Sequence, residues 1–267
     1  MKRISSRDNQ ILKLARKVRD GNHRELVFLE GKRLVKDAIQ SGILIRSIIF
    51  FEELPAEEIR PFIESRIEDR NGVYSVSRKL FDGIAETKNP QGVIALAERP
   101  KWSLDRIKLR LEDSGIVVKI ILYLSQINNP SNLGAAIRAA EAAGIAGVIT
   151  SPGSADPFSA KSIRGSMGSV FRVPIVENMD PKILFDLAAE YQLQMVGLDP
   201  RGDISIYEYD WTQPVILVVG SEAHGIAENE LSQAVKGLVI PMESTVESLN
   251  LAVSVGITLF EAKRRVT

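Results

Sequence analysis

The second half of the chain alternates apolar runs with stretches of helical periodicity, and this pattern restricts the fold more than any other feature of the sequence. Ile116 to Leu124 is almost continuously apolar, which is typical of a strand buried on both faces of a parallel sheet. We predict strands over 116–124, 146–150, 171–176, 194–198, 215–219 and 237–240, and helices over 133–143, 158–164, 181–191 and 228–234. This alternation predicts an α/β fold with a parallel sheet covered by helices on both faces.

The C-terminal stretch, residues 240–265, predicts a final helix. Ser244 with Glu247 three residues later is a capping-box pattern, so we expect the helix to begin there. Few residues between Leu249 and Phe260 are polar, which is typical of a buried helix. Polar side chains gather instead around its first turns, at Glu243, Ser248 and Asn250. Either this end of the helix faces a ligand or these residues form an ordinary cap, and the pattern alone leaves both interpretations open.

The first half has shorter elements and predicts a separate small α/β domain over residues 1–97. We predict strands over 26–29, 43–51, 73–76 and 93–97, and helices over 31–42, 55–70 and 78–86. Residues 98–115 contain Pro100 and many charged side chains, so we predict a linker there. The second domain then spans residues 116–267.

Composition excludes several classes of chemistry. The 267 residues include no Cys, which removes disulfides, Cys-ligated zinc and thiolate mechanisms. The two histidines, His23 and His224, make a His-based metal site or a Ser-His triad hard to assemble, and we predict no metal. No apolar run is long enough to cross a bilayer, and the N-terminal residues lack a signal-peptide core. We therefore predict a cytoplasmic protein without membrane contact.

A basic segment near the N-terminus stands out because the formal net charge of the whole chain is +0 at pH 7. Ile11, Leu14, Ala15 and Val18 recur at helical spacing, which predicts an amphipathic helix with a basic outer face. We interpret this face as an RNA contact, with a solvated helix surface as the alternative. The segment contains Lys2 and Arg3 and the six cations that we assign to RNA binding: Arg7, Lys13, Arg16, Lys17, Arg19 and Arg24.

Three loops at the carboxyl ends of predicted strands carry unusual polar residues. They are residues 128–138, 220–226 and 241–250. Ligands of parallel sheets bind at this edge, so the loops mark a site. The glycine fingerprint of dinucleotide sites, the P-loop and the nucleophile elbow are all absent from the sequence. A dinucleotide-dependent oxidoreductase is therefore disfavoured, but the loops alone do not identify the chemistry.

The same three loops resemble the three motifs of the SpoU (TrmH-type) family of RNA ribose 2′-O-methyltransferases. The first matches the family pattern N-x-G-x-x-x-R through Asn132, Gly134 and Arg138. The second matches G-x-E-x-x-G through Gly220, Glu222 and Gly225, and the third matches I-P-M…S-L-N through Ile240, Pro241, Met242, Ser248, Leu249 and Asn250. The motifs occur in the family's order and spacing. One departure is Asn129, where the family commonly has Asp before the Pro.

The resemblance covers nearly the whole chain. Residues 1–97 are similar to the L30e-like substrate-binding domain of many members, through Arg24 to Lys32 and Lys88 to Gly92. Membership implies a C-terminal domain with a trefoil knot, which the general rule against knots would not predict. It also implies S-adenosylmethionine bound in a bent form by the knotted loops, and a homodimer with its sites near the subunit interface.

The resemblance also implies roles for individual residues. The cofactor is expected to contact Gly220, Ile240, Met242 and Leu249, largely through backbone atoms. Arg138 is expected at the attacking 2′-hydroxyl, where it stabilises the developing alkoxide or acts as a base if desolvation removes its proton. Four further residues are expected to take part in catalysis. Asn132 would orient Arg138 or the ribose, and Ser248 and Asn250 would bind phosphate or shape the loop. Glu222 would anchor the site or assist proton movement. His224 is given no role.

The function that the resemblance implies is S-adenosylmethionine-dependent methylation of an RNA ribose 2′-hydroxyl. Members with this N-terminal domain mostly act on ribosomal RNA, so we expect large-subunit (23S-type) rRNA, with tRNA as the alternative. A non-catalytic RNA-binding protein is a further alternative, but it would not need Asn132, Arg138 and Ser248. A base methyltransferase of the wider knotted superfamily would show other loop motifs, and methylation at C5 of a pyrimidine is excluded by the lack of Cys.

Overall fold

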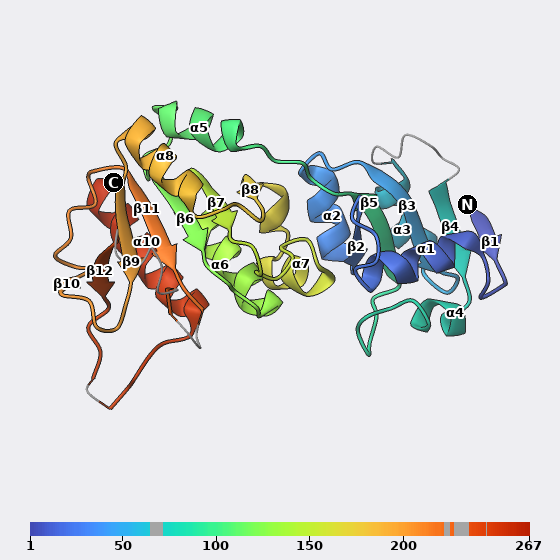
Figure 1. Ribbon diagram of the computed structural model, residues 1–267. Helices are drawn as coiled ribbons and strands as arrows, with labels where there is room; N and C mark the ends of the chain where they lie inside the picture. The colour runs from blue at the N-terminus through green and yellow to red at the C-terminus, as the bar shows by residue number, and fades with distance from the viewer. Residues whose placement is uncertain (65–71, 222–224, 227–234, 244) are drawn as a thin grey trace. The chain divides into compact units, whose positions relative to one another are not determined.

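The computed structural model describes residues 1–64, 72–221, 225–226, 235–243 and 245–267, and these form two compact units (Figure 1). Unit 1 comprises Met1–Lys101 with Phe158–Arg164, and unit 2 comprises Trp102–Pro157 with Gly165–Thr267. The sequence predicts one continuous second domain over 116–267, whereas 158–164 group with unit 1. This grouping arises because Ala160 packs against the core of unit 1 and Phe158 lies under the guanidinium of Arg99.

Unit 1 is built on a five-stranded mixed sheet in the order β1-β4-β3-β5-β2. Its strands are β1 (Lys2–Ile4), β2 (Leu26–Glu30), β3 (Ile45–Phe51), β4 (Val73–Val76) and β5 (Val93–Glu98). β1, β4 and β3 run parallel, while β5 is antiparallel to both of its neighbours. The helices of this unit are α1 (Gln10–Arg19), α2 (Lys32–Gln40), α3 (Ala56–Glu64) and α4 (Arg78–Asp82). The predicted strands are all present, and β1 is an additional edge strand.

Helix α1 is amphipathic, as its sequence predicts. Leu12, Ala15 and Val18 are buried in one core cluster with Phe28 and other apolar side chains of the sheet. Its first turn is capped by Asn9, whose side chain accepts a hydrogen bond from the backbone N–H of Ile11 at 2.9 Å. Lys13 and Lys17 are exposed on the side of the helix away from the core, whereas Arg16 and Arg19 are half-buried, and Arg19 donates a hydrogen bond to the carbonyl of Ala85.

The two segments that resemble the L30e-like domain, Arg24 to Lys32 and Lys88 to Gly92, meet in unit 1. The Gln91 side chain accepts a hydrogen bond from the backbone N–H of Lys32 at 3.1 Å, at the start of α2. The nearly buried carboxylate of Glu30 accepts hydrogen bonds from the backbone N–H groups of Glu86 and Thr87 at 2.6 and 3.2 Å. These bonds satisfy loop N–H groups and hold residues 86–91 against the end of β2.

Unit 2 contains a seven-stranded sheet in the order β10-β12-β9-β11-β6-β7-β8. Its strands are β6 (Ile120–Leu124), β7 (Gly147–Thr150), β8 (Ile175–Val176), β9 (Gln194–Leu198), β10 (Ile204–Ser205), β11 (Val215–Val219) and β12 (Lys236–Val239). All neighbouring pairs run parallel, as the alternating pattern predicts. β6 and β11 are buried along their whole length, which explains their continuous apolar sequence.

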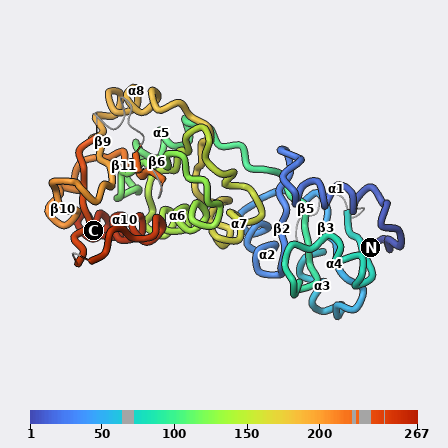
Figure 2. The backbone as a smooth tube through the Cα atoms, turned by 60° about the horizontal axis from the view of Figure 1, so that its bottom comes forward, coloured from blue at the N-terminus to red at the C-terminus, as the bar shows by residue number. Residues whose placement is uncertain are grey.

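The helices of the second half are α5 (Leu104–Glu112), α6 (Pro130–Ala143), α7 (Ala160–Ser166), α8 (Lys182–Tyr191) and α10 (Leu251–Val266), with a 3-10 turn over Ser169–Phe171. α10 lies beside α6 (Figures 1 and 2). The segment predicted as a linker, 98–115, contains α5, which buries Ile107 and Leu111 in the core of unit 2. The helix predicted over 228–234 lies outside the described residues. No helix in the described part of the chain is both long and apolar enough to cross a membrane.

α6, which carries the first motif, and α10, which follows the third motif, each begin after an asparagine cap. The side chain of Asn129 accepts a hydrogen bond from the backbone N–H of Ser131 at 2.9 Å, with Pro130 in the first turn of α6. Asn250 caps α10 in the same way, through the N–H of Ala252 at 2.9 Å. The prediction that the last helix begins at Ser244 is therefore wrong: it begins at Leu251, and the preceding residues run as a loop. Ser244 itself lies outside the described residues.

Candidate functional site

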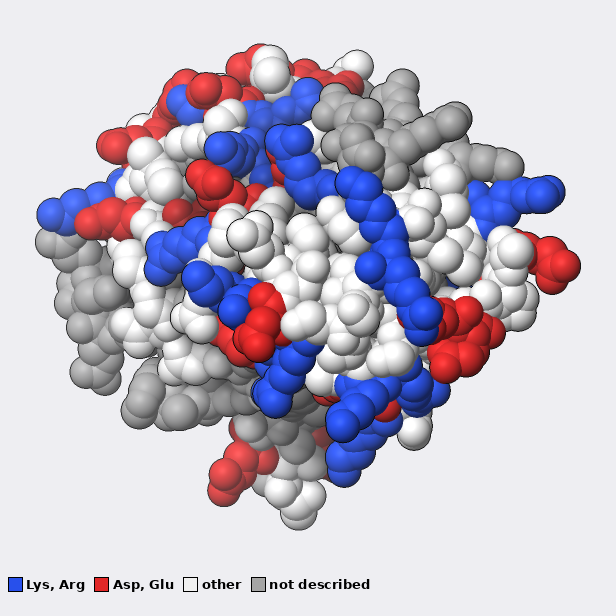
Figure 3. All heavy atoms as spheres, turned by 90° about the vertical axis from the view of Figure 1, so that its right-hand side faces the viewer, with Lys and Arg blue, Asp and Glu red and all other residues white. Residues whose placement is uncertain are grey.

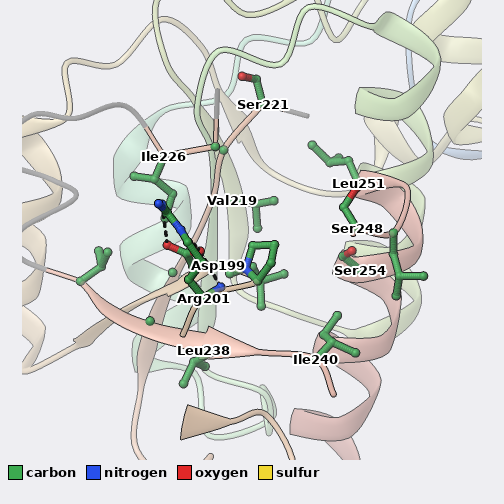
Figure 4. Close-up of a pocket in the computed structure, with 18 of the residues that line it drawn as sticks. Asp199, Arg201, Val219, Ser221, Ile226, Leu238, Ile240, Ser248, Leu251 and Ser254 are labelled. Atoms are coloured by element: carbon green, nitrogen blue, oxygen red, sulfur yellow. Dashed lines mark hydrogen bonds and ion pairs between the residues drawn. The ribbon is translucent and has the colours of Figure 1, made fainter. Parts of the chain in front are cut away.

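A cavity of about 650 Å³ opens at the carboxyl ends of β9, β11 and β12 (Figure 4). The end of β9 and the turn after it form one wall, and the loops after β11 and β12 form others. The entrance to α10 completes the lining with Ser248, Leu249, Leu251 and Ser254. Small-molecule sites of α/β proteins have this size and lie at this edge of the sheet. The cavity is therefore found where the sequence predicts a site.

The loop after β11 closes on itself by a backbone approach that only glycine allows. A Cβ atom on Gly220 would lie 2.0 Å from the carbonyl carbon of Gly225. The N–H of Gly225 donates a hydrogen bond to the carbonyl of Ser221 at 2.8 Å, and Gly225 has a φ of +63°. The structure thus explains both glycines of the G-x-E-x-x-G motif. Gly220 lets the backbone approach Gly225 closely, and Gly225 adopts a left-handed backbone conformation.

The four residues expected to contact a cofactor all line this cavity. They come from two loops: Gly220 follows β11, whereas Ile240, Met242 and Leu249 lie between β12 and α10. Ser248 lines the cavity as well. The walls are mainly apolar side chains and glycine backbone, so polar contacts to a ligand here would come chiefly from backbone N–H and C=O groups.

Two of the expected catalytic residues are joined directly. The side-chain amide of Asn250 donates a hydrogen bond to Oδ1 of Asn132 at 3.1 Å. Asn132 lies in the first turn of α6 and Asn250 caps α10, so the first and third motifs meet where these two helices begin. Leu249 and Leu251, on either side of Asn250, line the cavity. The asparagine pair is therefore adjacent to the cavity without forming part of its wall.

The structure does not bring Arg138 to this cavity. Arg138 lies on α6 nearly two turns beyond Asn132, and its side chain is exposed to solvent. Glu222 lies outside the described residues, as does His224. Of the four expected catalytic residues that the structure describes, only Ser248 lines the cavity of its own chain, while Asn132 and Asn250 lie next to it.

Sequence reasoning missed one wall of the cavity, the turn after β9. Asp199 and Arg201 are the only charged side chains among the described residues that line the cavity (Figure 4). Strand 194–198 was predicted, and the rule that ligands bind at strand ends applies to the loop that follows it. The rule thus marks the turn Asp199-Pro200-Arg201-Gly202 as a possible wall of a site, but no motif in it singles out Asp199 or Arg201.

Comparison with known proteins now identifies the family. The family model described as the SpoU rRNA methylase family matches residues 119–260, and that of the MRM3-like substrate-binding domain matches residues 9–95. The chain belongs to the SpoU rRNA methylase family. The predicted family is therefore confirmed, as is the α/β fold with a parallel sheet. The trefoil knot stays a prediction.

Several SpoU relatives span almost the whole chain. The 23S rRNA (guanosine(2553)-2′-O)-methyltransferase RlmP of Bacillus subtilis is 28% identical over 98% of this chain and 100% of its own length. The 23S rRNA (uridine(2479)-2′-O)-methyltransferase of Streptomyces viridochromogenes is 28% identical over 88% of this chain and 81% of its own length. Both names specify methylation of a ribose oxygen in large-subunit rRNA.

Solved SpoU structures match the fold of the entire chain. The AdoMet-bound rRNA methyltransferase from Sinorhizobium meliloti superposes with a TM-score of 0.85, at 29% identity over 100% of this chain and 98% of that chain. The AviRb methyltransferase from Streptomyces viridochromogenes, in complex with AdoMet, gives a TM-score of 0.81 at 27% identity over 96% and 98% of the two chains. Both of those proteins hold S-adenosylmethionine.

Proposed function

We propose that this protein is an S-adenosylmethionine-dependent RNA methyltransferase that methylates a ribose 2′-hydroxyl in large-subunit rRNA, with tRNA as the alternative substrate. The observation that carries the proposal is the cavity itself. Its lining includes the four residues predicted to contact the cofactor, and it adjoins the Asn132–Asn250 pair. The names of the relatives favour rRNA over tRNA.

The residues of the cavity fit S-adenosylmethionine. An adenine ring needs apolar walls and a few backbone partners, and Ile240, Met242 and Leu249 line the same cavity as Gly220 and Gly225. The volume of about 650 Å³ lies within the range of sites for ligands of this size. When bound, the cofactor supplies a methyl group on a positively charged sulfur, which needs no further activation.

The chain must supply orientation of the ribose and stabilisation of charge on its oxygen. Arg138 has an exposed guanidinium with N–H donors and no acceptor, so we assign it to stabilising the developing alkoxide. Asn132, held by Asn250, orients the ribose or Arg138. Ser248 binds the neighbouring phosphate, and Glu222, which lies outside the described residues, anchors the site through hydrogen bonds or assists proton movement.

Arg138 can act only near a cofactor, and it does not line the cavity of its own chain. A homodimer that packs α10 and α6 against a second copy would let one subunit contribute Arg138 to a site near the interface. The outer face of α10 supports this assignment because Val253 and Phe260 are both 49% exposed, and exposed apolar patches mark interaction surfaces.

Unit 1 is the proposed RNA-binding part. The face shown in Figure 3 carries many Lys and Arg side chains among acidic and uncharged surface. Of the predicted RNA contacts, Lys13 and Arg19 form ion pairs with Asp8 and Asp20, at 3.2 and 2.8 Å. The exposed side chain of Lys17 lies on the same helix, and Arg16 donates a hydrogen bond to the backbone carbonyl of Arg7 rather than to a carboxylate. These pairings favour Arg7, Arg16, Lys17 and Arg24 over Lys13 and Arg19 as phosphate contacts.

The proposal is tested with radiolabelled S-adenosylmethionine and separate pools of rRNA and tRNA from the host. Wild type is compared with Arg138→Ala and with Arg106→Ala, a control that removes an exposed arginine of α5 away from the site. We expect label in an alkali-resistant dinucleotide of rRNA, lost in Arg138→Ala and kept in Arg106→Ala. Label in tRNA would establish the alternative substrate. Absence of cofactor binding would contradict the enzyme assignment.

A further inference from the structure

The turn after β9 is held firmly in place beside the cavity. The backbone N–H of Asp199 donates a hydrogen bond to the carbonyl of Leu238 on β12 at 3.0 Å, and the N–H of Gly202 donates to the carbonyl of Asp199 at 2.9 Å. A Cβ atom on Gly202 would lie 2.7 Å from the backbone of Gly237, so the turn crosses β12 in close contact. Asp199 therefore has a fixed backbone at the carboxyl end of its strand.

The Asp199 carboxylate has one oxygen engaged and one nearly free. Oδ1 accepts a hydrogen bond from the backbone N–H of Arg201 at 2.8 Å and lies 3.3 Å from its Nε. Among the described residues, Oδ2 accepts a single hydrogen bond, a long one of 3.5 Å from the Arg201 guanidinium. The Arg201 side chain is 90% exposed, so water screens this ion pair and the guanidinium can swing away at small cost. A ligand in the cavity can thus reach Oδ2.

We infer that the Asp199 carboxylate accepts hydrogen bonds from the ribose hydroxyls of the cofactor, an inference that rests on the proposed function. S-adenosylmethionine has two kinds of donor that suit a carboxylate, the ribose hydroxyls and the α-ammonium. The backbone N–H bond to Oδ1 keeps Arg201 next to Asp199 even when its guanidinium moves off Oδ2, so a positive charge stays nearby and disfavours an ammonium there more than a neutral diol. A carboxylate at a strand end also binds a ribose hydroxyl in dinucleotide-binding folds, for the same chemical reason.

The test replaces Asp199 by Asn. Asparagine keeps the acceptor for the Arg201 N–H and therefore the turn, but it loses the charged acceptor that faces the cavity. Asp203→Asn is the matched control, because Asp203 is an exposed acid of the same loop that does not line the cavity. Binding is measured by calorimetry with three probes: S-adenosylhomocysteine, 5′-methylthioadenosine, which lacks the amino-acid part, and the 2′-deoxy form of 5′-methylthioadenosine.

We expect Asp199→Asn to weaken S-adenosylhomocysteine and 5′-methylthioadenosine by the same factor, about tenfold or more, because each loses a hydrogen bond to a charged group. The affinities of wild type and Asp199→Asn for the 2′-deoxy probe should differ less than their affinities for the other two probes. Asp203→Asn should bind all three probes with the affinity of wild type. A loss confined to S-adenosylhomocysteine would overturn the inference in favour of the ammonium, and unchanged binding of all probes would overturn it outright. Failure of wild type to bind S-adenosylhomocysteine would instead contradict the proposed function.

Discussion

Asn250 and Asn132, 118 positions apart in the sequence, are joined by a hydrogen bond of 3.1 Å from the amide of Asn250 to Oδ1 of Asn132. The same Asn250 side chain caps α10 through its own Oδ1, which accepts from the N–H of Ala252. Asn250 thus stabilises α10 through its side-chain oxygen and orients Asn132 through its side-chain nitrogen. The two roles can be separated by substitution.

Asn250→Ser should separate them, because serine is a good N-cap but is too short to reach Asn132. We expect the melting temperature to remain close to that of wild type and methyl transfer to fall at least about tenfold, the loss of one positioning hydrogen bond. Asn129→Ser makes the same exchange at the cap of α6 and should keep activity. Full activity of Asn250→Ser would show that the asparagine pair is not needed for transfer.

Gly220→Ala should damage both the loop and the cofactor site. Its new methyl group would lie 2.0 Å from the Gly225 carbonyl carbon, so the backbone must move. We expect a loss of about 1–3 kcal/mol in the free energy of unfolding, together with loss of S-adenosylhomocysteine binding. Gly83→Ala is the control, since its Cβ would meet the closest atom at an ordinary 3.4 Å. Unchanged cofactor affinity in Gly220→Ala would place the cofactor away from this loop.

Much of this architecture follows from the sequence pattern. The apolar runs of β6 and β11 predict their strands because both are buried throughout. The helical spacing of Ile11, Leu14, Ala15 and Val18 predicts α1, whose buried residues are Leu12, Ala15 and Val18. β1 escapes prediction because two of its three residues are exposed and charged, so no apolar alternation remains. α5 escapes because its sequence is mostly charged, and among its residues Ile107 and Leu111 are buried while Leu104 packs partly buried against the same core.

The errors at the site have similar causes. The pattern at Ser244 and Glu247 satisfies the rule for a capping box, yet Asn250 caps the helix and the intervening residues line or border the cavity. A rule based on local sequence cannot distinguish the two possible caps, the pattern at Ser244 and the one at Asn250. The choice between them depends on the tertiary site, where residues before Asn250 form a loop instead of a helical turn. Asp199 and Arg201 lie in a four-residue turn of ordinary composition, so only the position of β9 between β11 and β12 shows that they face the cavity.

Charge reversal on α1 should weaken RNA binding in a salt-dependent manner. Lys17→Glu removes one cation from the exposed face of the helix, and each lost phosphate contact should lower the slope of log K against log salt by about 0.7–0.9. Arg106→Glu, on α5 of unit 2, supplies the matched charge change. Filter binding over a salt series measures both quantities. An unchanged slope in Lys17→Glu would exclude this residue from the RNA contact.

Glu261 should make stability depend on acid pH. It accepts hydrogen bonds from Arg264 and Arg265, and these bonds, that of Arg264 foremost, lower its pKa to about 2 although burial opposes the shift. A carboxylate with a depressed folded-state pKa stabilises the fold above its unfolded value, near 4.5, and loses that contribution as pH falls toward 2. Glu261→Gln should flatten the dependence of melting temperature on pH in this window. Glu247→Gln, at an exposed position, should leave it as in wild type.

The proposed homodimer gives the last prediction. Phe260→Glu places a charge on the exposed apolar face of α10, where burial against a second subunit would leave the carboxylate without a partner. We expect the protein to become monomeric in light scattering and to lose methyl transfer, because Arg138 of one subunit then no longer reaches the cofactor of the other. Leu109→Glu makes a similar exchange at a 58% exposed position on α5 and should remain dimeric. A Phe260→Glu protein that stays dimeric would exclude this face as the interface. A monomer that remains fully active would show that Arg138 and the cofactor act within one chain.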